Sequence, residues 1–129
     1  MARAKLHGAE AMKKRLQTFA KKFPDEVGRA LYLETEIDAK EVKRRTPVRH
    51  GTLRGSVHVQ GPDRRWRTIS TLIVAGGPAA PYAVYVHENL EALHKVGQAK
   101  FLESVILESR PYITQRVAKR IELKRALPK

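Results

Sequence analysis

The first hydrophobic residues of the chain recur at alternating steps of three and four. The set begins at Ala9 and runs through Met12, Leu16 and Phe19 to Phe23, with lysines on the opposite side. This spacing lines one face of an α-helix, because an α-helix completes a turn in 3.6 residues. The pattern predicts an N-terminal helix over residues 1–23.

A second helical pattern begins directly after a proline. Pro24 suits the first turn of a helix, and the two acidic residues behind it complement the positive end of the helix dipole. Lys43, Arg44 and Arg45 follow an apolar stripe, and cations favour the carbonyl end of a helix. Pro47 then prevents continuation. The pattern predicts a helix over residues 24–46 that ends near Arg45.

The period of the pattern changes to two after residue 51. The apolar side of this stretch consists of Leu53, Gly55, Val57 and Val59, with polar residues between them. Such alternation is typical of a half-exposed strand. Turn residues follow at 61–63, and the run from Trp66 to Ala75 is rich in β-branched residues. These features predict a β-hairpin over residues 52–76.

The remainder of the chain returns to helical spacing. Over residues 82–89 the steps of three and four favour a short helix, with a strand as the alternative. An apolar stripe over residues 99–123 predicts a C-terminal helix that Pro111 kinks or restarts. The expected fold class is α+β: long amphipathic helices packed against a small antiparallel sheet built around the hairpin, in a single domain of residues 1–129.

Composition narrows the chemistry that this domain can perform. The chain has 129 residues, of which 42% are hydrophobic and 30% charged, which is typical of a globular domain. It contains no cysteine, so disulfides, cysteine nucleophiles and thiolate metal sites are excluded. No apolar stretch reaches membrane-spanning length and the N-terminus does not resemble a signal peptide, so no membrane partner is expected.

The charge of the chain is strongly positive. The net charge of +13 comes from 26 basic and 13 acidic residues. Residues 1–54 hold 14 basic and 7 acidic groups, residues 55–98 hold 4 and 3, and residues 99–129 hold 8 and 3. The excess therefore lies in the predicted helices. It permits non-specific contact with DNA, and a basic, sequence-tolerant DNA-binding protein is the alternative to the function inferred below.

No group of residues has the spacing that catalysis or metal binding requires. His87 and Glu88 begin a segment that resembles a zinc-protease motif, but the second histidine, His94, follows after seven residues instead of four. Solvent-exposed or helix-capping histidines are the simpler interpretation. The acidic residues Glu34, Glu36, Asp38 and Glu41 are interpreted as surface ion pairs. We expect no catalytic residue, cofactor or metal, and no enzyme.

One segment of the predicted hairpin could contact nucleic acid. Arg64, Arg65 and Arg67 flank Trp66 there, a combination found on surfaces that bind single strands. The structural alternative is a solvated turn whose charges protect the edge of the sheet.

Three segments in a fixed order resemble a known family. They are Thr46-Pro47-Val48-Arg49-His50-Gly51-Thr52-Leu53-Arg54-Gly55-Ser56, Tyr82-Ala83-Val84-Tyr85-Val86-His87-Glu88 and Gly97-Gln98-Ala99-Lys100-Phe101-Leu102-Glu103. Over about residues 25 to 122 the chain resembles the tail-completion and head-tail joining proteins of lambda-like and Hong Kong-type siphophages. It departs from many relatives at Asn89-Leu90-Glu91, where they have Phe-Gly-Thr.

The resemblance implies a virion structural protein of the neck, assembled in the host cytoplasm. It implies a homo-oligomeric ring, of about six or twelve copies, between the portal-adaptor proteins and the tail tube protein. The expected interaction surfaces are the exposed or irregular segments. They are the turn Pro47–Arg54 with Arg49 and His50, the hairpin tip Arg64–Arg67 with Arg65 and Trp66, Glu88, and the loop Asn89–Val96 with Leu93.

Overall fold

The computed structural model has an α+β fold in which helices dominate and two strands form a small antiparallel sheet. It describes residues 2–48, 51–65, 68–78, 80–89 and 97–124. The elements, in chain order, are α1 (Ala2–Lys22), α2 (Pro24–Arg45), α3 (Thr52–Ser56), β1 (His58–Arg65), β2 (Thr68–Val74), α4 (Ala83–Glu88), α5 (Phe101–Ser109) and α6 (Ile113–Lys124).

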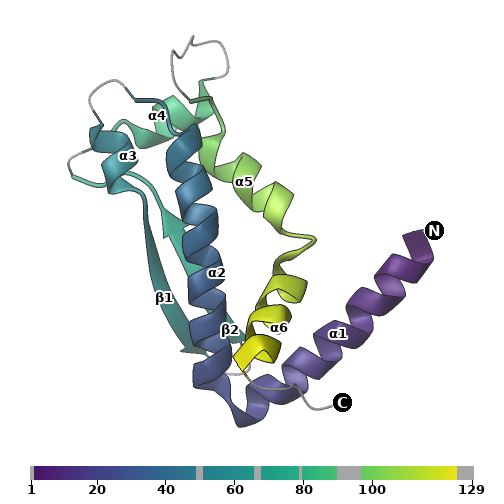
Figure 1. Cartoon of the computed structure of the whole chain (residues 1–129). Coiled ribbons are helices and arrows are strands. Elements are labelled where there is room, and N and C mark those ends of the chain that lie inside the picture. The colour runs from purple at the N-terminus through teal and green to yellow at the C-terminus, as the bar shows by residue number, and fades with distance from the viewer. Residues whose placement is uncertain (1, 49–50, 66–67, 79, 90–96, 125–129) are drawn as a thin grey trace.

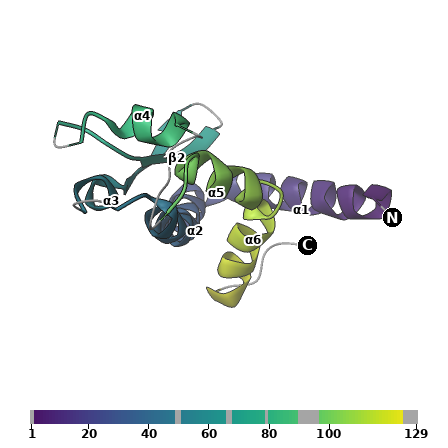
Figure 2. The ribbon, with the colours of Figure 1, turned by 90° about the horizontal axis from the view of Figure 1, so that it is seen from above.

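Helix α2 is the axis of the molecule (Figure 1). The hairpin of β1 and β2 packs along one side of it, and α5 and α6 pack along another. The view from above in Figure 2 separates these two sides. Helix α1 leaves the lower end of α2 and projects away, packing against α6 near its own C-terminal end. Every other long element is therefore positioned by its contact with α2.

The bounds of α2 follow from its terminal residues. Pro24 occupies the first turn, and three cations fill the last turn before the helix ends at Arg45, where the sequence predicts the end. Thr46 closes the helix because its backbone amide and its hydroxyl both donate to the carbonyl of Val42, at 2.9 and 2.6 Å. The Thr46 side chain is fully buried.

The hairpin lies against α2 with one face only. Its strands pair with Val59 opposite Ile73, and an irregularity lies between Gln60 and Asp63. Alternate residues of β2 face the helix, and the hydroxyls of Thr71 and Thr35 meet there at 2.6 Å. The approach is close at Gly28, where an added Cβ would lie 3.2 Å from the Pro62 ring. The opposite face of the hairpin is open to solvent.

The β-hairpin predicted over residues 52–76 is wrong at its start, because Thr52–Ser56 form α3 and β1 begins at His58. Leu53 and Val57 are both buried, at 4% and 1% exposure. Residues four apart share a side in a short helix just as they do in a strand, so alternation could not separate the two structures. Gly51, with φ +76°, begins the helical turn by accepting the amide of Gly55 at 2.9 Å.

The C-terminal half of the chain is helical. The segment expected to be a short helix or strand is the helix α4. The single helix expected over residues 99–123 is two helices, since α5 ends at Ser109 and α6 begins at Ile113. Pro111 lies between them, and a proline cannot supply the amide that would continue α5. Of the two effects predicted for Pro111, the structure shows the start of a new helix and not a kink in a single helix.

Two hydrophobic clusters lie at opposite ends of α2. The lower cluster joins α1, α2 and α6 through Phe19, Val27, Ala30, Val117, Ala118 and Ile121. The upper cluster joins α2, α3, α4 and α5 through Val42, Leu53, Val57, Ala80, Ala83, Phe101 and Val105.

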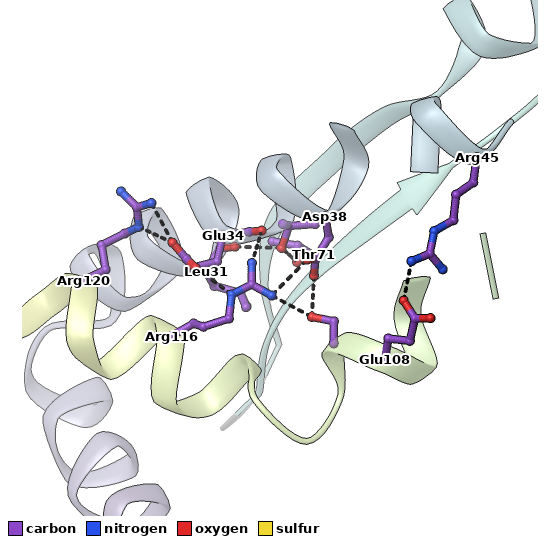
Figure 3. Close-up of polar contacts among 10 residues, drawn as sticks. Leu31, Glu34, Asp38, Arg45, Thr71, Glu108, Arg116 and Arg120 are labelled. Atoms are coloured by element: carbon purple, nitrogen blue, oxygen red, sulfur yellow. Dashed lines mark hydrogen bonds and ion pairs between the residues drawn. The ribbon is translucent and has the colours of Figure 1, made fainter. Parts of the chain in front are cut away.

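Polar side chains hold α6 to α2 between these clusters (Figure 3). Arg116 donates to Glu34 at 2.8 Å and to Asp38 at 2.9 Å, and Arg120 donates to Glu34 at 2.6 Å. Ser109 closes the group by donating to Asp38 at 2.6 Å. Burial acts to lower the pKa of Arg116, but its bonds to Asp38 and Glu34 outweigh that effect and raise it. We call this group the α2–α6 clamp.

The clamp corrects the interpretation of two acidic residues as surface ion pairs. Glu34 is only 6% exposed, and Asp38 is bound beside it. The arginines that bind them lie about 80 residues away in the sequence, so a search for partners on the same helix could not find them. Glu41 does pair locally, with Arg44 and Arg45.

Replacing Glu34 should destabilise the fold far more than replacing a surface acid. The substitution Glu34→Gln removes the carboxylate that Arg120 binds and one of the two that Arg116 binds, which should lower the free energy of unfolding by about 2–4 kcal/mol. Urea unfolding followed by circular dichroism measures the loss.

The matched control is Glu122→Gln, because Glu122 forms an exposed pair with Arg15 at 3.8 Å. That change should cost no more than about 1 kcal/mol. Equal losses for the two variants would show that the clamp does not stabilise the fold.

Candidate interaction site

The three sequence segments that carry the family resemblance meet at the upper end of α2 in Figure 1. We call this region the junction. It consists of Arg45–Pro47, Arg54, His87–Glu88 and Gly97–Glu103. Its contacts join segments that are far apart in the sequence, so it is the place where the chain brings its candidate residues together.

The end of α2 is covered by the segment that precedes α5. The amide of Gln98 donates to the carbonyl of Arg45 at 2.8 Å. At Gly97, whose φ is +89°, an added Cβ would lie 2.6 Å from both the Arg45 oxygen and the Pro47 nitrogen. Only glycine fits this backbone contact. The contact therefore explains why Gly97 stands at this position.

Arg54, an expected interaction residue, is used inside the junction. Its guanidinium donates to the carbonyls of Arg44 and Thr46, at 3.3 Å each. These carbonyls lie at the end of α2, where no helical amide can reach them. The Nε atom of Arg54 is buried and has no hydrogen-bond partner among the described residues. Arg54 therefore holds the turn in place and is not freely presented to a partner.

His87 connects α4 to the start of α5. Its Nε2 atom accepts the backbone amide of Glu103 at 3.2 Å, so Nδ1 carries the hydrogen and donates to Glu88 at 2.9 Å. The amide of Lys100 donates to the His87 carbonyl at 2.7 Å. The Phe101 ring meets the imidazole edge-on, with centroids 5.1 Å apart. His87 is thus a helix cap, the simpler of the two interpretations of the histidines.

Glu88 is occupied by the same connection. Lys100 binds its second carboxylate oxygen and also lies 3.3 Å from Glu103. The bond from Lys100, assisted by the bond from His87, lowers the pKa of Glu88. A carboxyl with a lowered pKa stays ionised at neutral pH and is a poor proton donor. The arrangement favours structural over acid-base use of Glu88.

Arg45 ties α2 to α5 below the junction. It donates to Glu41 at 2.9 Å within α2, and to Ser104 at 3.1 Å and Glu108 at 2.5 Å on α5. The bonds from Arg44 and Arg45 lower the pKa of Glu41 to about 2. Arg45, one of the three cations in the last turn of α2, therefore also holds a neighbouring helix.

The remaining predicted interaction residues fall into two groups. Pro47 is half-buried at the junction, whereas Arg64 and Arg65 are exposed at the far end of the hairpin, near the lower end of α2. The structure therefore does not bring the hairpin tip and the junction together. Five candidates lie outside the described residues, namely Arg49, His50, Trp66, Arg67 and Leu93, and so does the rest of the loop at positions 90–96.

Within the described ranges, no three histidine, aspartate or glutamate side chains are grouped so that they could hold a metal ion. In the same ranges, no helix combines the length and the apolar character needed to cross a membrane.

Comparison with known proteins gives one match. The model of the family described as "Bacteriophage HK97-gp10, putative tail-component" matches residues 10–104. This range contains all three segments of the resemblance. It begins before residue 25 and ends within α5, whereas the resemblance covers about residues 25 to 122. No curated protein and no solved structure matches the chain.

Gly97 should be irreplaceable at the junction. The substitution Gly97→Ala combines a left-handed backbone with a clash against Arg45 and Pro47, so unfolding should become easier by at least about 2 kcal/mol. Thermal and urea unfolding measure this change.

Gly55→Ala is the matched control, since an added Cβ at Gly55 meets nothing within 4 Å. It should leave stability unchanged or raise it by up to about 1 kcal/mol. A Gly97→Ala protein as stable as this control would contradict the close contact.

Proposed function

We propose that this chain, which belongs to the HK97-gp10-like family of bacteriophage tail components, is a head-tail joining or tail-completion subunit that assembles into a ring in the virion neck. The ring would link the portal-adaptor complex to the tail tube. The observation that carries the proposal is the family match over residues 10–104. The coarse function, a structural component of the phage tail, follows from membership in the family.

The structure supports a role in assembly and not in chemistry. The best candidates for acid-base work, His87 and Glu88, are engaged as a helix cap and as a partner of Lys100. General acid-base catalysis needs such groups free to exchange a proton with a substrate. We therefore propose that the protein is not an enzyme and that its mechanism is the docking of subunits.

A ring requires each subunit to offer two different faces. Head-to-tail contacts close into a ring when the rotation between neighbours divides a full turn. The chain presents the hairpin on one side of α2 and α5 with α6 on another, which supplies two such faces. About six or twelve copies is the ring size that the family resemblance implies.

Assembly can be tested with purified protein and with tail tubes that lack it. Native mass measurement and negative-stain imaging should show rings, or caps at one end of the tubes. Tubes incubated with a basic protein of similar size are the control for binding by charge alone. Monomers that attach to no part of the virion would contradict the proposal.

A sequence-tolerant DNA-binding protein is the second candidate. The observation in its favour is a set of exposed lysines on α1 with no ion pair among the described residues, namely Lys13, Lys14, Lys21 and Lys22. Such lysines attract phosphates, and the attraction falls steeply with salt.

Gel shifts over a range of salt concentrations separate the two candidates. A neck subunit with a generally basic surface should bind duplex DNA only weakly near physiological salt, with a dissociation constant above about 1 μM. Replacing the four lysines with glutamine should flatten the salt dependence. Submicromolar binding of unrelated sequences at that salt would favour the DNA-binding function instead.

A further inference from the structure

Helix α5 is apolar on two sides but packs with only one. Phe101 and Val105 are buried in the upper cluster, at 1% and 3% exposure. Ile106 and Leu107, on the side away from α2, are 40% and 57% exposed, and Tyr112 just beyond the helix is 59% exposed. A group of exposed apolar side chains on one side of a helix is typical of a surface that another element covers. The outward side of α5, which we call the α5 face, therefore lacks a cover in the single chain.

A groove lies on a different side of α2, between its first two turns and the hairpin. Its volume is about 390 Å³, and it is open to solvent. Most of its lining is apolar, and its charged residues lie on α2 and on β1. The lining residues are Pro24, Asp25, Gly28, Arg29, Tyr32, Gly61, Pro62, Arg64 and Ile69.

The α5 face and the groove belong to different sides of the subunit. Glu34 and Asp38 point from α2 toward α6, as Figure 3 shows, and Arg45 points toward α5. Gly28 and Tyr32 line the groove instead, and they lie on another side of the same helix. One surface of this chain can therefore contact the other surface only in a second copy.

The charges around the two surfaces are complementary. The α5 face is flanked by the carboxylates of Glu103 and Glu108. They pair with Lys100 and Arg45 of the same chain, but their side chains are still 50% and 64% exposed, so they can accept further donors. The groove carries the guanidinium groups of Arg29 and Arg64, with Asp25 as its one carboxylate among the described residues. Apolar centres with charges of opposite sign at their edges favour one docked orientation.

We propose that the α5 face of one copy docks into the groove of the next copy, with Ile106 and Leu107 entering between α2 and the hairpin. This proposal rests on the proposed function, because it names the contact that builds the ring. The contact is heterologous, so repetition gives a closed ring when the rotation divides a full turn and a filament when it does not. A single copy would leave both surfaces open.

Cysteine cross-linking can test the contact without background, because the chain contains no cysteine. Two single variants, Arg29→Cys and Leu107→Cys, place one thiol at the groove and one on the α5 face, both at exposed positions. They are mixed, assembled on tail tubes and treated with a short bismaleimide. The matched control replaces Arg29→Cys with Gln17→Cys, an exposed position on α1. Imaging of the same samples records whether rings form.

The expected result is a covalent dimer in the mixture of Arg29→Cys and Leu107→Cys, at least tenfold more abundant than in the control mixture. A chain carrying both substitutions should give a ladder of multimers up to the full ring. Rings that form without this cross-link overturn the contact while leaving the ring intact. Covalent dimers of the Leu107→Cys variant alone would show that two α5 faces meet each other. A cross-link between Leu107→Cys and the tube protein would show that the tube covers the α5 face. Either result overturns the proposed contact. If no ring forms, the proposed function fails and the contact with it.

Discussion

The attachment of α6 to α2 through Glu34 is the interaction on which the shape of this protein depends. Two guanidinium groups, from Arg116 and Arg120, meet one carboxylate that is almost fully buried. Burying the carboxylate or either guanidinium group alone would cost free energy. Together with Asp38, these charged groups supply one another's hydrogen bonds. Because α1 packs against both α2 and α6, the direction in which α1 projects is set by the same contact.

At the other end of α2, segments that are distant in the sequence form one structural unit. Gly97 permits the chain to cross the end of α2, and Arg54 binds the last carbonyls of that helix. His87 then caps α5, so that α4 and α5 are fixed relative to each other. Each of the three motifs is a weak signal when taken alone. Their order is informative because all of them are required to build the same junction.

The helices could be predicted from the sequence because their period, prolines and terminal charges agree. The start and end of α2 are the clearest case. The helix α3 could not be distinguished from a strand, since Leu53 and Val57 suit either structure. The clamp could not be predicted at all, because a glutamate on a helix gives no sign of whether its partner lies one turn away or on another helix. The role of Arg54 could not be predicted either, because its acceptors are backbone carbonyls, which the sequence does not mark.

The basic residues of the chain fall into two groups, those that bind other groups of the chain and those that are exposed. Arg45, Arg54, Arg116 and Arg120 bind carboxylates or carbonyls of the chain itself, so they add to the net charge without forming a surface for phosphates. Among the described residues, exposed cations are found on α1 and around the groove, and also on the last turns of α2, at Arg110 and on α6. A surface that binds DNA along its length would need these charges to be continuous. In the docking proposed above, the cations of the groove would instead meet the carboxylates of a neighbouring copy.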